Sequence, residues 1–292
     1  MSLAEKTSEI LQYINTVVAC SSSIFIHGYI IRRIKLNATS FTNYRNFLVL
    51  QSTVYIVGSV LGLILNERTT LKLEDRTGYP FFVLPSWLTS VISAACDFID
   101  VGEVMLLTLF NIHRVLIFSR PRKIGLLYII GLPIAFFGSI LVGVLDAFFQ
   151  DISYYSSCTY YAVTLTIVLV CYFILRRHFR LNNYSIVVRK AQNKMSKGLL
   201  IQIFVQTTTL GIMSIGPIIS LVASLFRLSE STADEVLGIY MVIYVVFLWF
   251  SVLIGFIIKW SISGLLTIKQ SHRPSRVPNE MAVVKAKENI ET

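Results

Sequence analysis

The chain has 292 residues, of which 54% are hydrophobic and 14% charged, and its mean hydropathy is +0.68. These values exclude an ordinary soluble domain, in which roughly 25% of residues are charged. The formal net charge of +10 does not indicate nucleic-acid binding, because the basic residues are distributed as membrane topology requires.

Six long segments contain no charged residue. A helix that crosses the hydrocarbon core of a bilayer needs about 20 apolar residues, and each segment reaches that length. The segments are residues 10–31, 46–66, 124–145, 152–175, 198–226 and 236–258. We expect each of them to form one transmembrane helix.

One more segment, residues 77–112, is the third in chain order. It has prolines near its start and three acidic residues in its middle. It could form one long, proline-opened helix or two short ones. With one helix and the amino terminus outside, 21 of the 26 Lys and Arg residues fall on cytoplasmic loops and the tail, in agreement with the positive-inside rule. Two helices would place the basic residues of 114–123 outside. The sequence therefore predicts an all-α membrane protein, a seven-transmembrane helix bundle with the amino terminus outside and the carboxyl terminus cytoplasmic.

The remaining residues are too few to bury a core of their own. We expect residues 1–9 to be an extracellular amino terminus and residues 10–258 to be the bundle. Residues 259–269 place Ile262, Leu265 and Leu266 on one face, as in a short interfacial helix. Prolines and mixed charges predict a disordered cytoplasmic tail over residues 270–292.

The third segment carries three acids at steps of three residues, Asp97, Asp100 and Glu103; we call them the acid stripe. An acid inside a membrane helix costs about 3 kcal/mol on insertion scales, so such residues face the bundle interior or water and mark a site. Each step turns the helix by about 300°, so the side chains form a sloping line. We interpret the stripe as functional. The alternative is a structural role, with hydrogen bonds to polar neighbours such as Gln51, Ser52 or Gln206.

Enzyme chemistry has no support in the sequence. The four histidines are scattered, and the chain has neither a glycine-rich phosphate loop nor a nucleophile elbow. We therefore expect no enzyme, no cofactor and no metal site.

The sequence does not decide whether two of the four cysteines form a disulfide. Of the four, only Cys158 falls clearly in a predicted outer loop. Its candidate partner is Cys96, which would lie about 16 Å along the third helix from Pro85 at 1.5 Å per residue. A disulfide and two separate thiols both remain possible readings.

The inner end of the third segment reads Leu109-Phe110-Asn111-Ile112-His113-Arg114-Val115. An arginine at this place, seven helices, Pro217 in the sixth segment and a short tail resemble a G-protein-coupled receptor. Two further stretches are similar to the nematode serpentine chemoreceptors: the sixth segment, from Lys197-Gly198-Leu199-Leu200-Ile201-Gln202 to Ile215-Gly216-Pro217, and the opening of the second, Tyr44-Arg45-Asn46-Phe47-Leu48. The resemblance covers residues 10–268.

The chain departs from rhodopsin-like receptors at four places. His113 stands where an acid would precede the arginine, and the second segment has no aspartate. The sixth segment reads Ser214-Ile215-Gly216-Pro217, without the tryptophan that rhodopsin-like receptors have there. The seventh segment, residues 236–258, lacks their Asn-Pro-x-x-Tyr motif. Such losses are common in the nematode superfamily, so they favour it over the mainstream class. They leave open whether Arg114 is an activation switch or only the basic end of a span.

The resemblance implies a chemosensory receptor of the plasma membrane, with sensory cilia as a candidate location. Its partners would be a small external ligand, a heterotrimeric G protein and membrane lipid, and not nucleic acid. Arg114 would couple to the G protein and Pro217 would be a conformational hinge. The ligand pocket is expected at Asp97, Phe98, Asp100, Tyr240 and Tyr244. The alternative function is a transporter or ligand-gated ion-conducting protein that uses the intramembrane acids.

Overall fold

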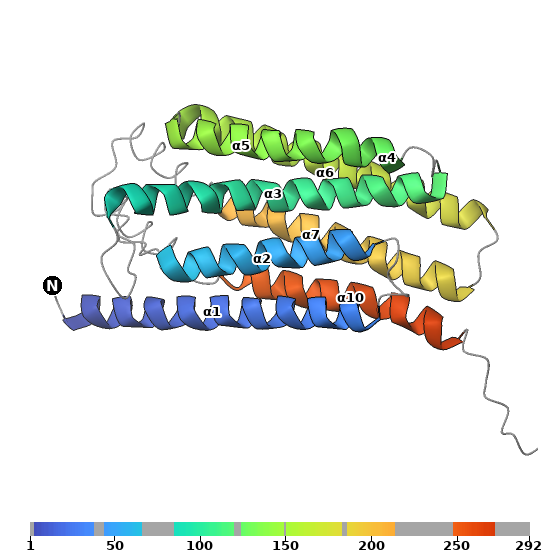
Figure 1. Cartoon of the computed structure of the whole chain (residues 1–292), viewed down its shortest axis with the longest axis horizontal. Helices are drawn as coiled ribbons and strands as arrows, with labels where there is room; N and C mark the ends of the chain where they lie inside the picture. The colour runs from blue at the N-terminus through green and yellow to red at the C-terminus, as the bar shows by residue number, and fades with distance from the viewer. Residues whose placement is uncertain are drawn as a thin grey trace, which may run out of the picture.

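Long helices lie side by side along the molecule in this computed structural model (Figure 1). The structure describes residues 3–37, 44–65, 85–119, 124–148, 150–182, 186–213 and 248–271. Within these ranges nearly every residue is helical and none belongs to a strand. The prediction of an all-α fold is confirmed for this part of the chain.

Helices that follow one another among the described residues run in opposite directions (Figure 1). α4, the π-helical turn η3 and α5 are continuous, so they form one rod. The elements are α1 (Leu3–Leu36), α2 (Arg45–Leu65), α3 (Ser86–Ser119), α4 (Ile124–Leu126), η3 (Leu127–Gly131), α5 (Leu132–Phe148), α6 (Gln150–Leu181), α7 (Ile186–Met213) and α10 (Phe250–Ser271).

Five helical stretches in the described residues are long and apolar enough to cross a membrane. They are Tyr13–Leu36, Arg45–Ile64, Ala94–Ser119, Ile124–Leu141 and Thr159–Leu181. A helix satisfies its backbone hydrogen bonds internally, which is what the hydrocarbon core of a bilayer demands. α10 carries a shorter apolar stretch, Phe250–Ser263. The chain is therefore a membrane-embedded helical protein.

The third predicted segment is one helix wherever the structure describes it. α3 begins directly after Pro85, and the Leu88 N–H donates a hydrogen bond of 2.9 Å to the Pro85 carbonyl oxygen. It then continues through all three acidic positions to Ser119 without a break. The expectation of a single proline-opened helix is confirmed over this range.

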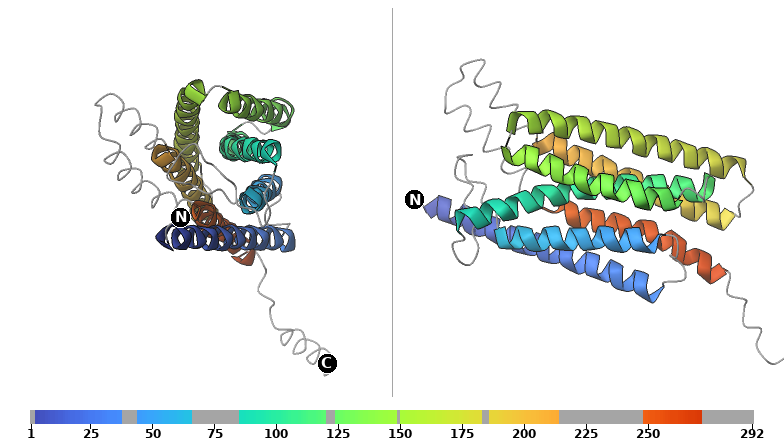
Figure 2. Two further views of the ribbon diagram at one scale, coloured as in Figure 1. Left: turned by 90° about the vertical axis from the view of Figure 1, so that its left-hand side faces the viewer. Right: turned by 45° about the horizontal axis from the view of Figure 1, so that its top comes forward.

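α3 occupies the middle of the bundle. It packs against α2, α5, α6 and α7, and Figure 1 shows it running between α5 and α2. Half of its apolar stretch is buried, compared with 11% for Ile124–Leu141. Residues on α3 can therefore contact most of the other helices, whereas the rod of α4, η3 and α5 lies at the periphery (Figure 2).

The first and last described helices also touch. α1 packs against both α2 and α10, and α10 packs against α7. These contacts, with those of α3 and α6 to α7, join the beginning and the end of the chain around one buried interior. Two serine hydroxyl pairs reinforce the junction, because Ser23 Oγ lies 2.7 Å from Ser59 Oγ on α2 and 2.6 Å from Ser251 Oγ on α10.

Several helices extend beyond the predicted apolar runs. α1 already begins at Leu3, and α7 begins at Ile186, twelve positions before the uncharged run from 198. α10 runs through Lys259 to Ser271 without interruption, so residues 259–269 continue the last helix. The proposed disordered tail lies outside the described residues from 272 onward.

Candidate functional site: a buried arginine and a polar layer

Arg114 lies in the C-terminal part of α3 and is completely buried, with 0% of its surface exposed. It is at the end of the bundle where α1, α3 and α6 finish, which we call the basic end because Arg33, Lys35, His178 and Arg180 stand in the last turns of α1 and α6. The central position of α3 explains this burial, since α6 and α7 both pack against it.

The guanidinium of Arg114 is held by α7. Its Nη2 donates to the side-chain oxygen of Gln192 at 3.1 Å, to the backbone carbonyl of Gln192 at 3.3 Å and to Ser196 Oγ at 3.0 Å. We call this set, Arg114, Gln192 and Ser196, the arginine bridge. It connects α3 to the N-terminal half of α7 through one nitrogen atom.

The arginine bridge contains no carboxylate. Among the described residues the partners of Arg114 are neutral oxygens, those of Gln192 and Ser196 and the hydroxyl of Tyr44, while its Nε and Nη1 atoms are buried without a hydrogen bond. Removing a charged group from water costs several kcal/mol, which neutral hydrogen bonds only partly offset. These two nitrogens could therefore donate to a further acceptor that entered this region.

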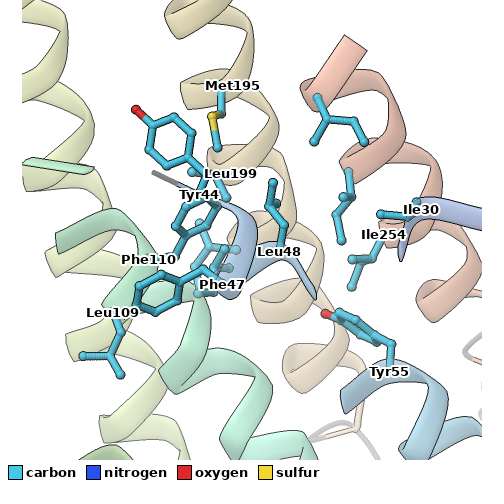
Figure 3. Packing of buried hydrophobic residues seen from close by; sticks show 14 of the residues in the cluster. Ile30, Tyr44, Phe47, Leu48, Tyr55, Leu109, Phe110, Met195, Leu199 and Ile254 are labelled. Carbon is cyan, nitrogen blue, oxygen red and sulfur yellow. The ribbon is translucent and has the colours of Figure 1, made fainter. Parts of the chain in front are cut away.

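Tyr44 extends the arginine bridge to α2. The Gln192 side-chain amide donates to the Tyr44 hydroxyl at 3.4 Å, and this hydroxyl is close enough to Arg114 to interact with its charge. Figure 3 shows the Tyr44 ring beside Met195 and Leu199 of α7 and Phe110 of α3. One polar contact region therefore joins α2, α3 and α7.

His113, the neighbour of Arg114, faces another set of partners. Its ring lies 4.9 Å from Phe47 and 5.7 Å from Tyr128, centroid to centroid, and its Nε2 is 3.3 Å from the Tyr128 hydroxyl. Successive residues on a helix point about 100° apart, which separates the two side chains. His113 thus packs between α2 and η3, within an aromatic group that also includes Phe110.

A second polar region lies about three helical turns from Arg114, around the acid stripe. The side chain of Asp97 is outside the described residues. Asp100 is exposed and Glu103 is half-buried. The Tyr55 hydroxyl of α2 is close enough to the Glu103 carboxyl for a hydrogen bond, and Asp100 is within electrostatic range of Tyr161 on α6.

The acid stripe is connected to α7 through Tyr55. The side-chain amide of Gln206 donates to the Tyr55 hydroxyl at 3.0 Å, and one turn away that of Gln51 donates to Gln202 Oε1, also at 3.0 Å. These two pairs share a spacing of four residues on both helices, so they form a ladder between α2 and α7. We call Gln51, Tyr55, Gln202 and Gln206 the polar ladder.

The polar ladder was only partly visible in the sequence. The structural alternative for the acids names Gln51, Ser52 and Gln206 as candidate neighbours, and Gln206 reaches Glu103 through Tyr55. Tyr55 itself was missed. The signal that could have found it is the matching four-residue spacing of polar residues, 51 and 55 on one segment and 202 and 206 on another.

The other predicted site residues are only partly described. Phe98 packs edge to face with Phe136 of α5, with ring centroids 5.7 Å apart. Cys96 is half-buried on α3, but the side chain of Cys158 lies outside the described residues, so the disulfide stays a prediction. Tyr240, Tyr244 and Pro217 also lie outside them, and so the pocket and hinge stay predictions.

The described part of the chain contains no group of three or more His, Cys, Asp or Glu residues that could hold a metal ion. A scan of protein-family models and a search of curated proteins found no match to this chain.

Proposed function

We propose that this chain is a seven-helix chemosensory receptor of the plasma membrane that binds a small external ligand and activates a heterotrimeric G protein. The observation that carries the proposal is the arginine bridge: a fully buried cation that links the central helix to α7 through neutral oxygens alone. A contact of this kind can be given up for another acceptor at modest cost. The resemblance to nematode serpentine receptors supports the same function.

α7 provides the connection between ligand and effector. It carries Gln206 in the polar ladder and Gln192 in the arginine bridge, 14 positions apart, or about 21 Å along a helix. A ligand bound near the acid stripe that displaced Gln206 would move α7 as a rigid element. The same movement would release Arg114 for an acceptor on the G protein. The ligand acts by shifting the population between the two arrangements.

The first prediction concerns topology. In the proposal α7 and α10 complete a seven-helix membrane bundle, with the amino terminus outside and the basic end in the cytoplasm. An epitope tag at the amino terminus should therefore bind antibody on intact cells, and a tag at the carboxyl terminus only after permeabilisation. An amino-terminal tag hidden in intact cells would contradict both the odd number of spans and the orientation.

The second prediction concerns the acid stripe. Asp97→Asn and Asp100→Asn should shift the potency of a ligand, found with a broad odorant panel, more than Glu103→Gln does. Glu103 lies about 9 Å farther along α3 than Asp97, and a glutamine there can still accept a hydrogen bond from Tyr55. The measurement is the concentration–response curve for G-protein activation. A larger shift in potency for Glu103→Gln would mean that the ligand does not bind at Asp97 and Asp100.

A second candidate function is a transporter or ligand-gated ion-conducting protein. The observation in its favour is a group of buried oxygens in and beside the polar ladder. Gln51 Oε1, Ser52 Oγ and Gln206 Oε1 are buried without a hydrogen-bond partner among the described residues. Intramembrane acids beside such oxygens suit proton or cation paths. In a conducting path all three acids would be needed, so neutralising any one should remove a ligand-gated current.

A further inference from the structure

Three cations lie against aromatic rings where α1 ends and α10 passes beside it (Figure 1). Lys259 Nζ is 5.2 Å from the ring centroid of Tyr29, and Arg33 Cζ is 5.9 Å from the same centroid. Lys194 Nζ on α7 is 5.0 Å from the Trp260 ring. An aromatic face attracts a cation, so these side chains are held at defined places at the basic end.

Arg33 and Lys259 share one ring although they carry the same charge. Arg33 also donates a hydrogen bond of 3.1 Å from Nη1 to the Tyr29 hydroxyl, and Lys259 lies 5.9 Å from the Phe256 ring. Neither cation has a carboxylate partner among the described residues. Because the two cations lie 5.9 and 5.2 Å from the same ring centroid, they are at most about 11 Å apart. Like charges repel, and an anion that contacted both would add two attractions.

The rings beside these cations face out of the bundle. Phe256 is 53% exposed, Trp260 42% and Tyr29 40%. Tyr29 belongs to the membrane-spanning stretch Tyr13–Leu36, of which Arg33 is near the end. The cations therefore lie beside exposed aromatic rings near the end of a membrane-spanning stretch, as is usual at a membrane interface, where aromatic and basic side chains gather.

We propose that the basic ends of α1 and α10 bind one anionic phospholipid, with its phosphate between Arg33 and Lys259 and an acyl chain along Phe256. A lipid fits better than a soluble anion because it fills both halves of this site at once, the charged half and the exposed apolar half. Lys194 and Trp260 flank the site on the α7 side. Anionic lipids are concentrated in the cytoplasmic leaflet, and basic sites between membrane helices on that side bind their headgroups.

Native mass spectrometry of the full chain in detergent tests the site. Phosphatidylserine is titrated against wild type, against Arg33→Gln with Lys259→Gln, and against a control, Arg176→Gln with Arg177→Gln. The control removes the same charge from exposed residues of α6. The affinity for the first phosphatidylserine should fall about 30-fold in the site variant, which loses two basic residues, and stay near wild type in the control. Phosphatidylcholine binding should be the same in all three.

Two further arms separate the site from its alternatives. Arg33→Lys with Lys259→Arg keeps both charges and should keep the bound lipid, whereas a loss equal to that of the Gln variant would overturn the proposal. Glycerophosphoserine, the soluble headgroup, should bind far more weakly than phosphatidylserine; equal binding would mean that no lipid is required. Equal losses of phosphatidylserine in the site and control variants would also overturn the proposal, because net charge alone would then explain binding.

Discussion

Replacing Arg114 with alanine should reduce ligand-evoked G-protein activation to the level of cells that lack the chain, while surface expression remains. Arg114 supplies the only charged donor of the arginine bridge, and its two unpartnered nitrogens are the groups that a G-protein acceptor would use. Arg114→Met is the companion variant, because it replaces the side chain by an apolar one of similar length and leaves no large cavity. Activation is measured by energy transfer between labelled G-protein subunits.

Controls for this prediction come from both sides of the contact. Arg176→Ala removes an exposed arginine of α6 and should leave the response unchanged. Gln192→Leu with Ser196→Ala removes both side-chain acceptors and should raise activation without ligand, since Arg114 then has little to hold it against α7. If Arg114→Met signals like wild type, Arg114 is a topological charge and the proposed switch is wrong.

Gly198→Ala should destabilise the protein more than any other glycine-to-alanine change on α1 or α7 that the structure describes. A Cβ atom at Gly198 would lie 2.8 Å from Cβ of Ser261 on α10 and closer still to its hydroxyl oxygen. Both Cβ atoms are bonded directly to the backbone, so they cannot move apart unless the two helices separate. Such overpacking costs about 1–3 kcal/mol. The expected result is a lower Tm in a thermal unfolding assay of the purified chain.

Gly28→Ala is the matched control, because a Cβ atom there meets nothing within 4 Å. It should keep or raise the Tm, since alanine favours a helix over glycine by about 0.5–1 kcal/mol. In Gly198→Ala with Ser261→Gly the clashing side chain is gone, so part of the lost stability should return. No loss of Tm in Gly198→Ala would mean that α7 and α10 are not in close contact at Gly198 and Ser261.

The sequence predicts the membrane-crossing stretches well, because a missing charge is a local property. The uncharged runs 46–66 and 124–145 coincide closely with α2 and with the rod from α4 to α5. Helix ends are predicted poorly. Charged residues such as Arg189 and Lys190 mark the end of the apolar layer, but they are good helix formers, so α7 continues through them from Ile186.

The polar contacts could not be predicted in the same way, because they join residues far apart in the chain. Gln192 and Ser196 follow Arg114 by 78 and 82 positions, and only the packing of α7 on α3 brings them together. The sequence identified Arg114 and the missing acid at His113, and it left open what held the arginine. In the structure the hydrogen-bond acceptors of Arg114 on α7 are neutral oxygens, and no local sequence pattern predicts them.

We propose that the chain transmits a signal to a G protein and does not conduct ions. The most direct test expresses wild type and the Gln192→Leu, Ser196→Ala variant in one cell line and records G-protein activation and whole-cell current together, so that no ligand need be known. We expect higher ligand-independent activation in the variant than in wild type, without current in either. An ionic current that Glu103→Gln abolishes, with no G-protein activation from either form, would contradict it.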